Sequence, residues 1–83
     1  MPLFMDEHNA VDGLTAQAVG EAHKRDLEVQ KKYGVNYISY WFNEDVGKVY
    51  CLVEAPNAEA AHTVHKEAHG LIADEIIEVK EGQ

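Results

Sequence analysis

Three histidines recur at helical spacing in the second half of the sequence: His62, His65 and His69. Residues three and four positions apart lie on the same face of a helix, so these side chains are expected to line one side of it. Two imidazoles at positions i and i+4 can hold one divalent metal ion. The HExxH motif of zinc proteases is absent, because Lys66 follows His65. The spacing therefore predicts a metal site without protease chemistry, although such a pair also occurs in helices that bind no metal.

A helix must carry these histidines, and strands must surround that helix. Apolar periodicity, capping residues and turn residues predict six elements in one domain covering residues 1–83. The expected strands are residues 3–7, 35–42, 48–54 and 75–80, and the expected helices are residues 16–32 and 58–69. The order β-α-β-β-α-β with right-handed crossovers predicts an α+β, ferredoxin-like sandwich. Two helices then cover one face of a four-stranded antiparallel sheet.

This topology brings further side chains toward the histidine helix. His8 follows the first strand, which runs parallel to that helix, so we expect it near His69. The acidic residues expected close by are Asp6, Glu7, Asp74 and Glu75. Asp26 lies on the apolar face of the first helix, at the level of His62 and His65 in the antiparallel second helix. An unpaired buried carboxylate is costly, and an imidazole or a metal ion would satisfy it.

The donor set limits which metal the site would take. His23, one turn before Asp26, adds a further candidate ligand, although a lone histidine on a helix is more often a surface residue. Imidazole and carboxylate ligands suit Ni(II), Zn(II), Co(II) or Cu(II). Ligating histidines must be neutral, so affinity is expected to fall as the pH drops below about 6.5.

Asp26 and His65 also suggest an alternative function. A carboxylate can orient and charge an imidazole, which makes a general acid–base pair. The alternative is therefore a small dimeric α+β barrel enzyme of the isomerase or cofactor-independent oxygenase type. An enclosed apolar pocket of a few hundred Å³ would favour the enzyme. A solid core with histidines facing solvent would favour metal binding.

Aromatic residues are concentrated in the second and third expected strands, which pair through a hairpin. They are Tyr37, Tyr40, Trp41, Phe42 and Tyr50. One helical layer cannot cover all of this surface, and an exposed apolar patch usually marks an interface. About half of the set is expected to fill the core. The remainder predicts a homodimer formed by face-to-face sheet pairing, in an assembly of the dimeric α+β barrel type.

Composition excludes several classes of partner. Seven basic and fifteen acidic residues give a net charge of −8, which disfavours nucleic-acid binding. No stretch has transmembrane length, and the N-terminus lacks the features of a signal peptide, so we expect no membrane association and a cytoplasmic location. Cys51 is the single cysteine, which excludes an internal disulfide. Its place within a strand is typical of a small core residue.

The chain resembles a family of small bacterial nickel-binding proteins that form ferredoxin-like dimers. The matching stretches are Met5-Asp6-Glu7-His8, Ala22-His23 with Asp26, Tyr33-Gly34-Val35 with Trp41, residues 49–56 (VYCLVEAP), and residues 65–70 (HKEAHG) through Ile76 to Val79. The resemblance covers essentially the whole chain. It implies a cytoplasmic dimer that binds nickel near its surface and acts in sequestration or detoxification. It also implies His8, His65 and His69 as ligands, with His23 and Asp26 as weaker candidates, whereas His62 lies outside the family pattern.

Overall fold

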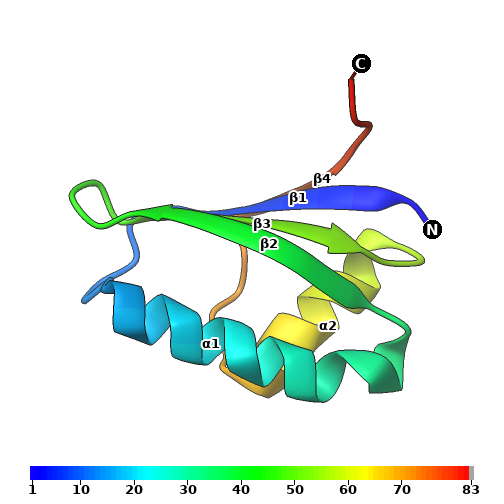
Figure 1. Ribbon diagram of the computed structural model, residues 1–83, viewed down its shortest axis with the longest axis horizontal. Helices are drawn as coiled ribbons and strands as arrows, with labels where there is room; N and C mark the ends of the chain where they lie inside the picture. Colours follow the sequence, from blue (N-terminus) through cyan, green and yellow to red (C-terminus); the bar gives the residue numbers. More distant parts are fainter. Residues whose placement is uncertain (83) are drawn as a thin grey trace.

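The computed structural model describes residues 1–82 and contains the predicted order of elements (Figure 1). Strands β1, β2, β3 and β4 cover Leu3–His8, Asn36–Asn43, Lys48–Glu54 and Glu75–Val79. Helices α1 and α2 cover Ala16–Val29 and Ala58–Ala68, and a short 3-10 helix, η1, covers Gln30–Tyr33. Among residues 1–82, no helix combines the length and the apolar character needed to cross a membrane.

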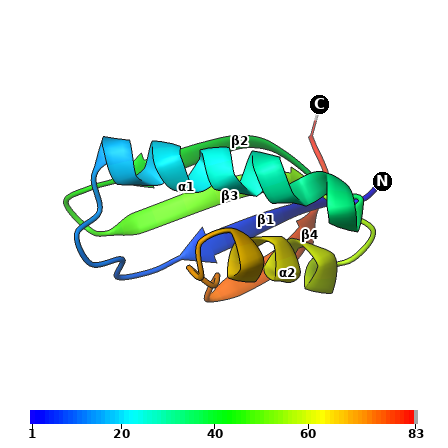
Figure 2. The same cartoon turned by 90° about the horizontal axis from the view of Figure 1, so that it is seen from below.

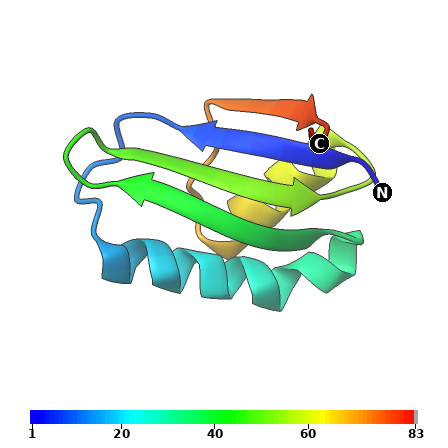
Figure 3. The ribbon, with the colours of Figure 1, turned by 45° about the horizontal axis from the view of Figure 1, so that its top comes forward.

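The four strands form one antiparallel sheet in the order β2-β3-β1-β4, which Figure 3 shows from one edge to the other. Both helices pack on the same face of this sheet, so the fold has two layers (Figure 1). Seen from the helical side, α1 follows β2 and β3, and α2 crosses β1 and β4 (Figure 2). The predicted ferredoxin-like sandwich is confirmed, and both central strands, β3 and β1, lie under the helices.

Helix α1 begins as predicted and ends earlier. The side chain of Thr15 accepts a hydrogen bond from the Ala18 N–H at 3.1 Å, which caps the helix. The regular helix stops at Val29 instead of Lys32, because the chain tightens into η1, as helix ends often do. Gly34 then takes a left-handed conformation with φ of 66°, which residues with a Cβ rarely adopt.

Alternation along β1 and β3 directs every second side chain toward the helices. The inward-facing, buried side chains of the two strands are Phe4, Asp6, His8, Val49, Cys51 and Val53. The antiparallel register places Asp6 directly beside Cys51. A carboxylate, an imidazole and a thiol therefore belong to the same buried layer as the apolar core.

The other sheet face carries no helix within residues 1–82 (Figure 1). Trp41 is 51% exposed there, and with Met5 and Tyr50 it lines a shallow hollow. Tyr37 is only 3% exposed, and Tyr40 packs its ring against a side chain of α1. The aromatic set is therefore divided between the core and an open apolar face, as expected.

Candidate metal centre

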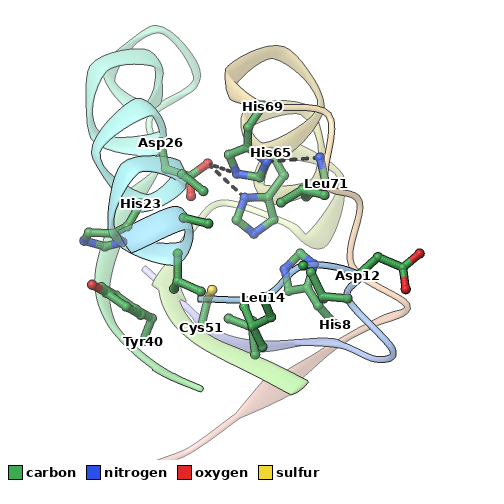
Figure 4. Close-up of a pocket in the computed structure, with 16 residues that line it drawn as sticks. His8, Asp12, Leu14, His23, Asp26, Tyr40, Cys51, His65, His69 and Leu71 are labelled. Atoms are coloured by element: carbon green, nitrogen blue, oxygen red, sulfur yellow. Dashed lines mark hydrogen bonds and ion pairs between the residues drawn. The ribbon is translucent and has the colours of Figure 1, made fainter. Parts of the chain in front are cut away.

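His65 lies at the centre of the buried polar cluster, and both of its ring nitrogens face carboxylates. Its side chain projects from α2 and is 1% exposed. Nδ1 lies 2.9 Å from Asp26 Oδ1, a contact drawn in Figure 4. Nε2 lies 2.8 Å from Asp6 Oδ2. One imidazole thus joins α2 to α1 and to β1.

Electrostatics make His65 an imidazolium at neutral pH. Burial opposes the charge, but hydrogen bonds to Asp26 and Asp6 and the attraction of both carboxylates outweigh it and raise the pKa of His65 to about 9. Burial also acts to raise the pKa of both carboxyls. Hydrogen bonds and charge from the neighbouring histidines overcome that effect, so the pKa of Asp6 and that of Asp26 lie below their usual value. Two carboxylates therefore share one cation, and this core of the centre carries a net charge of about −1.

Two further histidines flank the carboxylates. His8 Nε2 lies 3.4 Å from Asp6 Oδ1, and His69 Nε2 lies 3.0 Å from Asp26 Oδ1. His69 is the first residue beyond α2, and its Nδ1 accepts a hydrogen bond from the Leu71 N–H at 3.0 Å. When the His69 ring is neutral, its proton therefore lies on Nε2, toward Asp26.

Potential ligand atoms converge in two groups that share His65. Asp6, His8, Cys51 and His65 form one group, and Asp26, His65 and His69 form the other; within each, the ligand atoms lie within 4.8 Å of one another. Bonds of 2.0–2.3 Å to a metal place ligand atoms about 3–4 Å apart, so small side-chain movements would close either group. The structure therefore contains two overlapping sets of residues with the chemistry and proximity of a metal site.

The first group contains a polar atom whose hydrogen-bonding capacity is unused. Asp6 is fully buried, and its Oδ2 receives the Tyr37 hydroxyl at 3.1 Å as well as His65. Its Oδ1 makes no hydrogen bond, although buried carboxylate oxygens nearly always do. Burial raises the pKa of the Cys51 thiol, and the nearby Asp6 carboxylate raises it further. A cation placed in this group would satisfy Asp6 Oδ1 and reverse the effect on the thiol, because a coordinating thiol is deprotonated.

A cavity of about 120 Å³ adjoins the centre (Figure 4). His8, Asp26, Cys51, His65 and His69 form its polar wall. The expected alternatives were a pocket of a few hundred Å³ or a solid core with solvent-facing histidines, and the structure shows neither. His8, His65 and His69 are buried or nearly so, and they line this small cavity.

Comparison with known proteins identifies the relatives of the chain. The sequence profile described as nickel responsive protein SCO4226-like matches residues 4–79. The chain belongs to this family. The crystal structure of SCO4226 from Streptomyces coelicolor A3(2) matches with a TM-score of 0.90 and 41% sequence identity, covering 98% of this chain and 99% of that chain. No curated protein sequence matches.

The predicted site residues separate into those that converge and those that do not. His8, Asp26, His65 and His69 meet at one centre, and Asp26 contacts His65 as expected. His8 lies closest to Asp6 and His65 rather than His69. His23 lines the cavity and belongs to neither ligand group.

His62 and the nearby acidic residues also lie outside both groups. His62 is half-buried one turn before His65. Glu7 pairs with Lys48 at 3.4 Å, and the side chain of Asp74 accepts a hydrogen bond from the Asn9 N–H. These carboxylates therefore have structural partners of their own.

Sequence reasoning missed two members of the centre. Asp6 was expected only as a neighbour of His8, and Cys51 was predicted to be a core residue without chemistry. Both lie at positions of their strands that face the helices. Every second residue of a strand faces the same side, so these positions can be identified from the sequence. The carboxylate of Asp6, at an inward-facing position of a central strand, was the feature of the sequence that could have identified this part of the centre.

Proposed function

We propose that this chain binds a divalent transition-metal ion, nickel foremost, through Asp6, His8, Cys51 and His65. The observation that carries the proposal is the buried Oδ1 of Asp6, which makes no hydrogen bond within residues 1–82, faces His8 Nε2 at 3.4 Å and belongs to a group of four potential ligands. Membership of a family described as nickel responsive supports nickel as the ion. Sequestration or detoxification of the metal would be the cellular role.

Charge balance supports a divalent occupant. In the metal-free centre, Asp6 and Asp26 carry two negative charges against the single positive charge of His65. A divalent ion that displaces the His65 proton leaves two carboxylates, a neutral imidazole and two positive charges. Because a coordinating thiol is deprotonated, the occupied centre keeps the net charge of about −1 that it has without the ion, so binding adds no net charge to the buried site.

The hydrogen bonds of His65 favour the first ligand group over the second. If Nε2 gives up its proton to a metal, Nδ1–H continues to donate to Asp26. A metal-bound histidine held by a carboxylate through its other nitrogen is a common arrangement in metalloproteins. In the second group, ligation by His69 Nε2 would require moving a proton to Nδ1, which accepts the Leu71 N–H. We therefore assign Asp26 and His69 to positioning the ligands.

The donor set suits several late transition metals. One thiol, two imidazoles and one carboxylate fit Ni(II), Co(II), Zn(II) and Cu(II), and the thiol increases the preference for the softer members of the series. Nickel is preferred among them because of the family description. When bound, the ion would supply a strong positive charge at the inner end of the cavity.

Equilibrium dialysis with Ni(II) tests the proposed ligands. Replacing His8 or Cys51 with alanine removes one ligand and leaves the bridge from Asp6 through His65 to Asp26 intact. We expect each variant to bind nickel at least about a hundredfold more weakly. Losing a residue that only supports a ligand costs about 10–100-fold in metal affinity, and losing the ligand itself costs more. His62→Ala, on the same helix but outside both groups, is the matched control and should bind as the wild type does. Unchanged uptake by both ligand variants would refute this site.

The contact between Asp26 and His65 keeps the enzyme as a second candidate function, but neither nitrogen of His65 is free to act as a base. Both nitrogens of His65 are held by carboxylates, so neither is available to a substrate. General acid–base catalysis requires a group within hydrogen-bonding reach of the reacting proton. An Asp26–His65 catalytic pair is therefore less well supported than metal binding.

We also propose that the chain acts as a homodimer in the cytoplasm. The open sheet face carries Trp41, Met5 and Tyr50 around one hollow, which suits the matching face of a second copy. Trp41→Glu would place charge at that interface and should convert the dimer to a monomer in sedimentation equilibrium. A wild-type protein that sediments as a monomer at micromolar concentration would contradict this assembly. Cell fractionation tests the location.

A further inference from the structure

The hydroxyl of Tyr37 is a buried polar group beside the proposed ligands that has no role in the metal centre so far. Tyr37 lies in β2, an edge strand of the sheet, and its side chain is buried. Its Oη lies 3.1 Å from Asp6 Oδ2 and 3.2 Å from the carbonyl oxygen of Ala61 in α2. The hydroxyl has one proton, and a charged carboxylate is a stronger acceptor than a carbonyl. The proton is therefore directed to Asp6.

The ring of Tyr37 also contacts a second proposed ligand. Its centroid lies 4.6 Å from that of the His65 imidazole, and the two ring planes are inclined by 33°. Both side chains are buried, so close packing holds the tyrosine ring in place and with it the position of the hydroxyl.

The two carboxylate oxygens of Asp6 have different partners. Oδ2 receives the Nε2–H of His65 at 2.8 Å and the Tyr37 hydroxyl at 3.1 Å. Oδ1 makes no hydrogen bond within residues 1–82 and faces His8 Nε2 at 3.4 Å. Oδ1 is therefore the oxygen that is left for an ion, and it lies beside another proposed ligand.

Metal binding removes one of the two donors to Oδ2. The ion takes the place of the His65 Nε2 proton, so that hydrogen bond is lost, and a carboxylate can then bind the ion through one oxygen or through both. A tyrosine keeps its proton at neutral pH, since its ordinary pKa is near 10, so the Tyr37 hydroxyl still donates to Oδ2. We propose that Tyr37 is a positioning residue of the metal centre, which restricts Asp6 to ligation through Oδ1 alone. This inference rests on the metal site proposed above.

Ligation through one oxygen limits the protein to one donor atom from each ligand. The four donors are then Asp6 Oδ1, the sulfur of Cys51 and one nitrogen each of His8 and His65. Mixed donors in this number suit transition-metal ions, whereas Ca²⁺ takes about 6–8 oxygens and often binds both oxygens of a carboxylate. Tyr37 therefore contributes to the preference of the site for transition metals over calcium.

The variant Tyr37→Phe, loaded with Co(II), tests this role. It removes the hydroxyl and keeps the ring that packs against His65. The visible absorption of bound Co(II) weakens as the number of donors rises above four, so we expect weaker absorption at saturating Co(II) in this variant, because Asp6 Oδ2 joins the ion. We also expect Co(II) affinity to fall by about 10–100-fold, the usual cost of losing an outer partner of a ligand.

The matched control is Tyr33→Phe. It removes a tyrosine hydroxyl that lies 2.7 Å from a carboxylate oxygen of Glu67 at the exposed surface, away from the centre. This variant should have the Co(II) spectrum and affinity of the wild type.

A Co(II) spectrum of Tyr37→Phe identical to that of the wild type would overturn the role of Tyr37 even if the affinity falls, because a purely structural defect weakens binding without changing the donors. Infrared difference spectra of the wild type with ¹³C-labelled aspartate give a second reading that needs no variant. Ligation through one oxygen separates the two carboxylate stretching bands more widely than ligation through both, so a narrow separation would also overturn the role of Tyr37. A wild-type protein that binds no Co(II) would instead refute the metal site itself, and this inference with it.

Discussion

Replacing His65 with alanine is expected to lower the free energy of unfolding of the metal-free protein by about 3–5 kcal/mol at pH 6. Within residues 1–82, the substitution removes the only group that contacts both Asp6 and Asp26 at hydrogen-bonding distance. Two buried carboxylates then lack their cation, and removing one partner of a buried ion pair is among the most damaging single changes. Urea denaturation followed by circular dichroism measures the loss.

The pH dependence of that loss follows from the shifted pKa values. The folded-state pKa of His65 is raised from 6.5 to about 9, so its stabilising contribution is complete below pH 6.5 and disappears as the pH rises through 9. The pKa values of Asp6 and Asp26 are lowered from 3.8, so their contributions are present above that value and are lost in acid. The cost of His65→Ala should therefore be greatest near pH 4–6.5 and shrink toward pH 9. His62→Ala serves as the control, and an equal loss in both variants would contradict this account.

Nickel affinity is expected to rise steadily between pH 7 and pH 9. Binding must displace the proton of His65, whose pKa is about 9, and the proton of the Cys51 thiol, whose pKa is raised by burial. Competition by two protons predicts about hundredfold tighter binding per pH unit up to pH 8, and about 5,000-fold between pH 7 and 9. The raised pKa of His65 moves this range above the value near 6.5 expected for an ordinary histidine.

Competition titrations with a chelator of known proton affinity measure this dependence. Surface histidines would give an affinity that becomes level above about pH 7.5, since their pKa lies near 6.5. A level affinity in that range would show that nickel binds without displacing the buried protons. It would place the ion elsewhere on the chain.

The fold was accessible from the sequence because local signals agreed along the chain. Thr15 capped the first helix as predicted, and Lys48–Glu54 matched the predicted strand at both ends. The end of the first helix was the main error. The tightening of its last turn into η1 depends on tertiary contacts that helix propensity does not report.

Only part of the metal centre could be predicted from the sequence. Helical spacing gives positions along an axis to about one turn, or 5.4 Å, so it placed Asp26 beside His62 and His65, whereas the carboxylate contacts His65 and His69. Cys51 becomes a candidate ligand only through its register partner Asp6, and sequence patterns do not fix register between strands distant in the chain. The ring orientation of His69 depends on a backbone N–H of the following loop, which no spacing rule predicts.

Nickel K-edge X-ray absorption on the full chain loaded with one equivalent of Ni(II) at pH 8 tests the central proposal most directly. Ligation by Asp6, His8, Cys51 and His65 predicts one sulfur neighbour together with imidazole scattering. The sulfur signal should vanish in Cys51→Ala, while His62→Ala keeps the wild-type spectrum. A shell of nitrogen and oxygen alone, identical in the wild type and Cys51→Ala, would contradict the proposed centre.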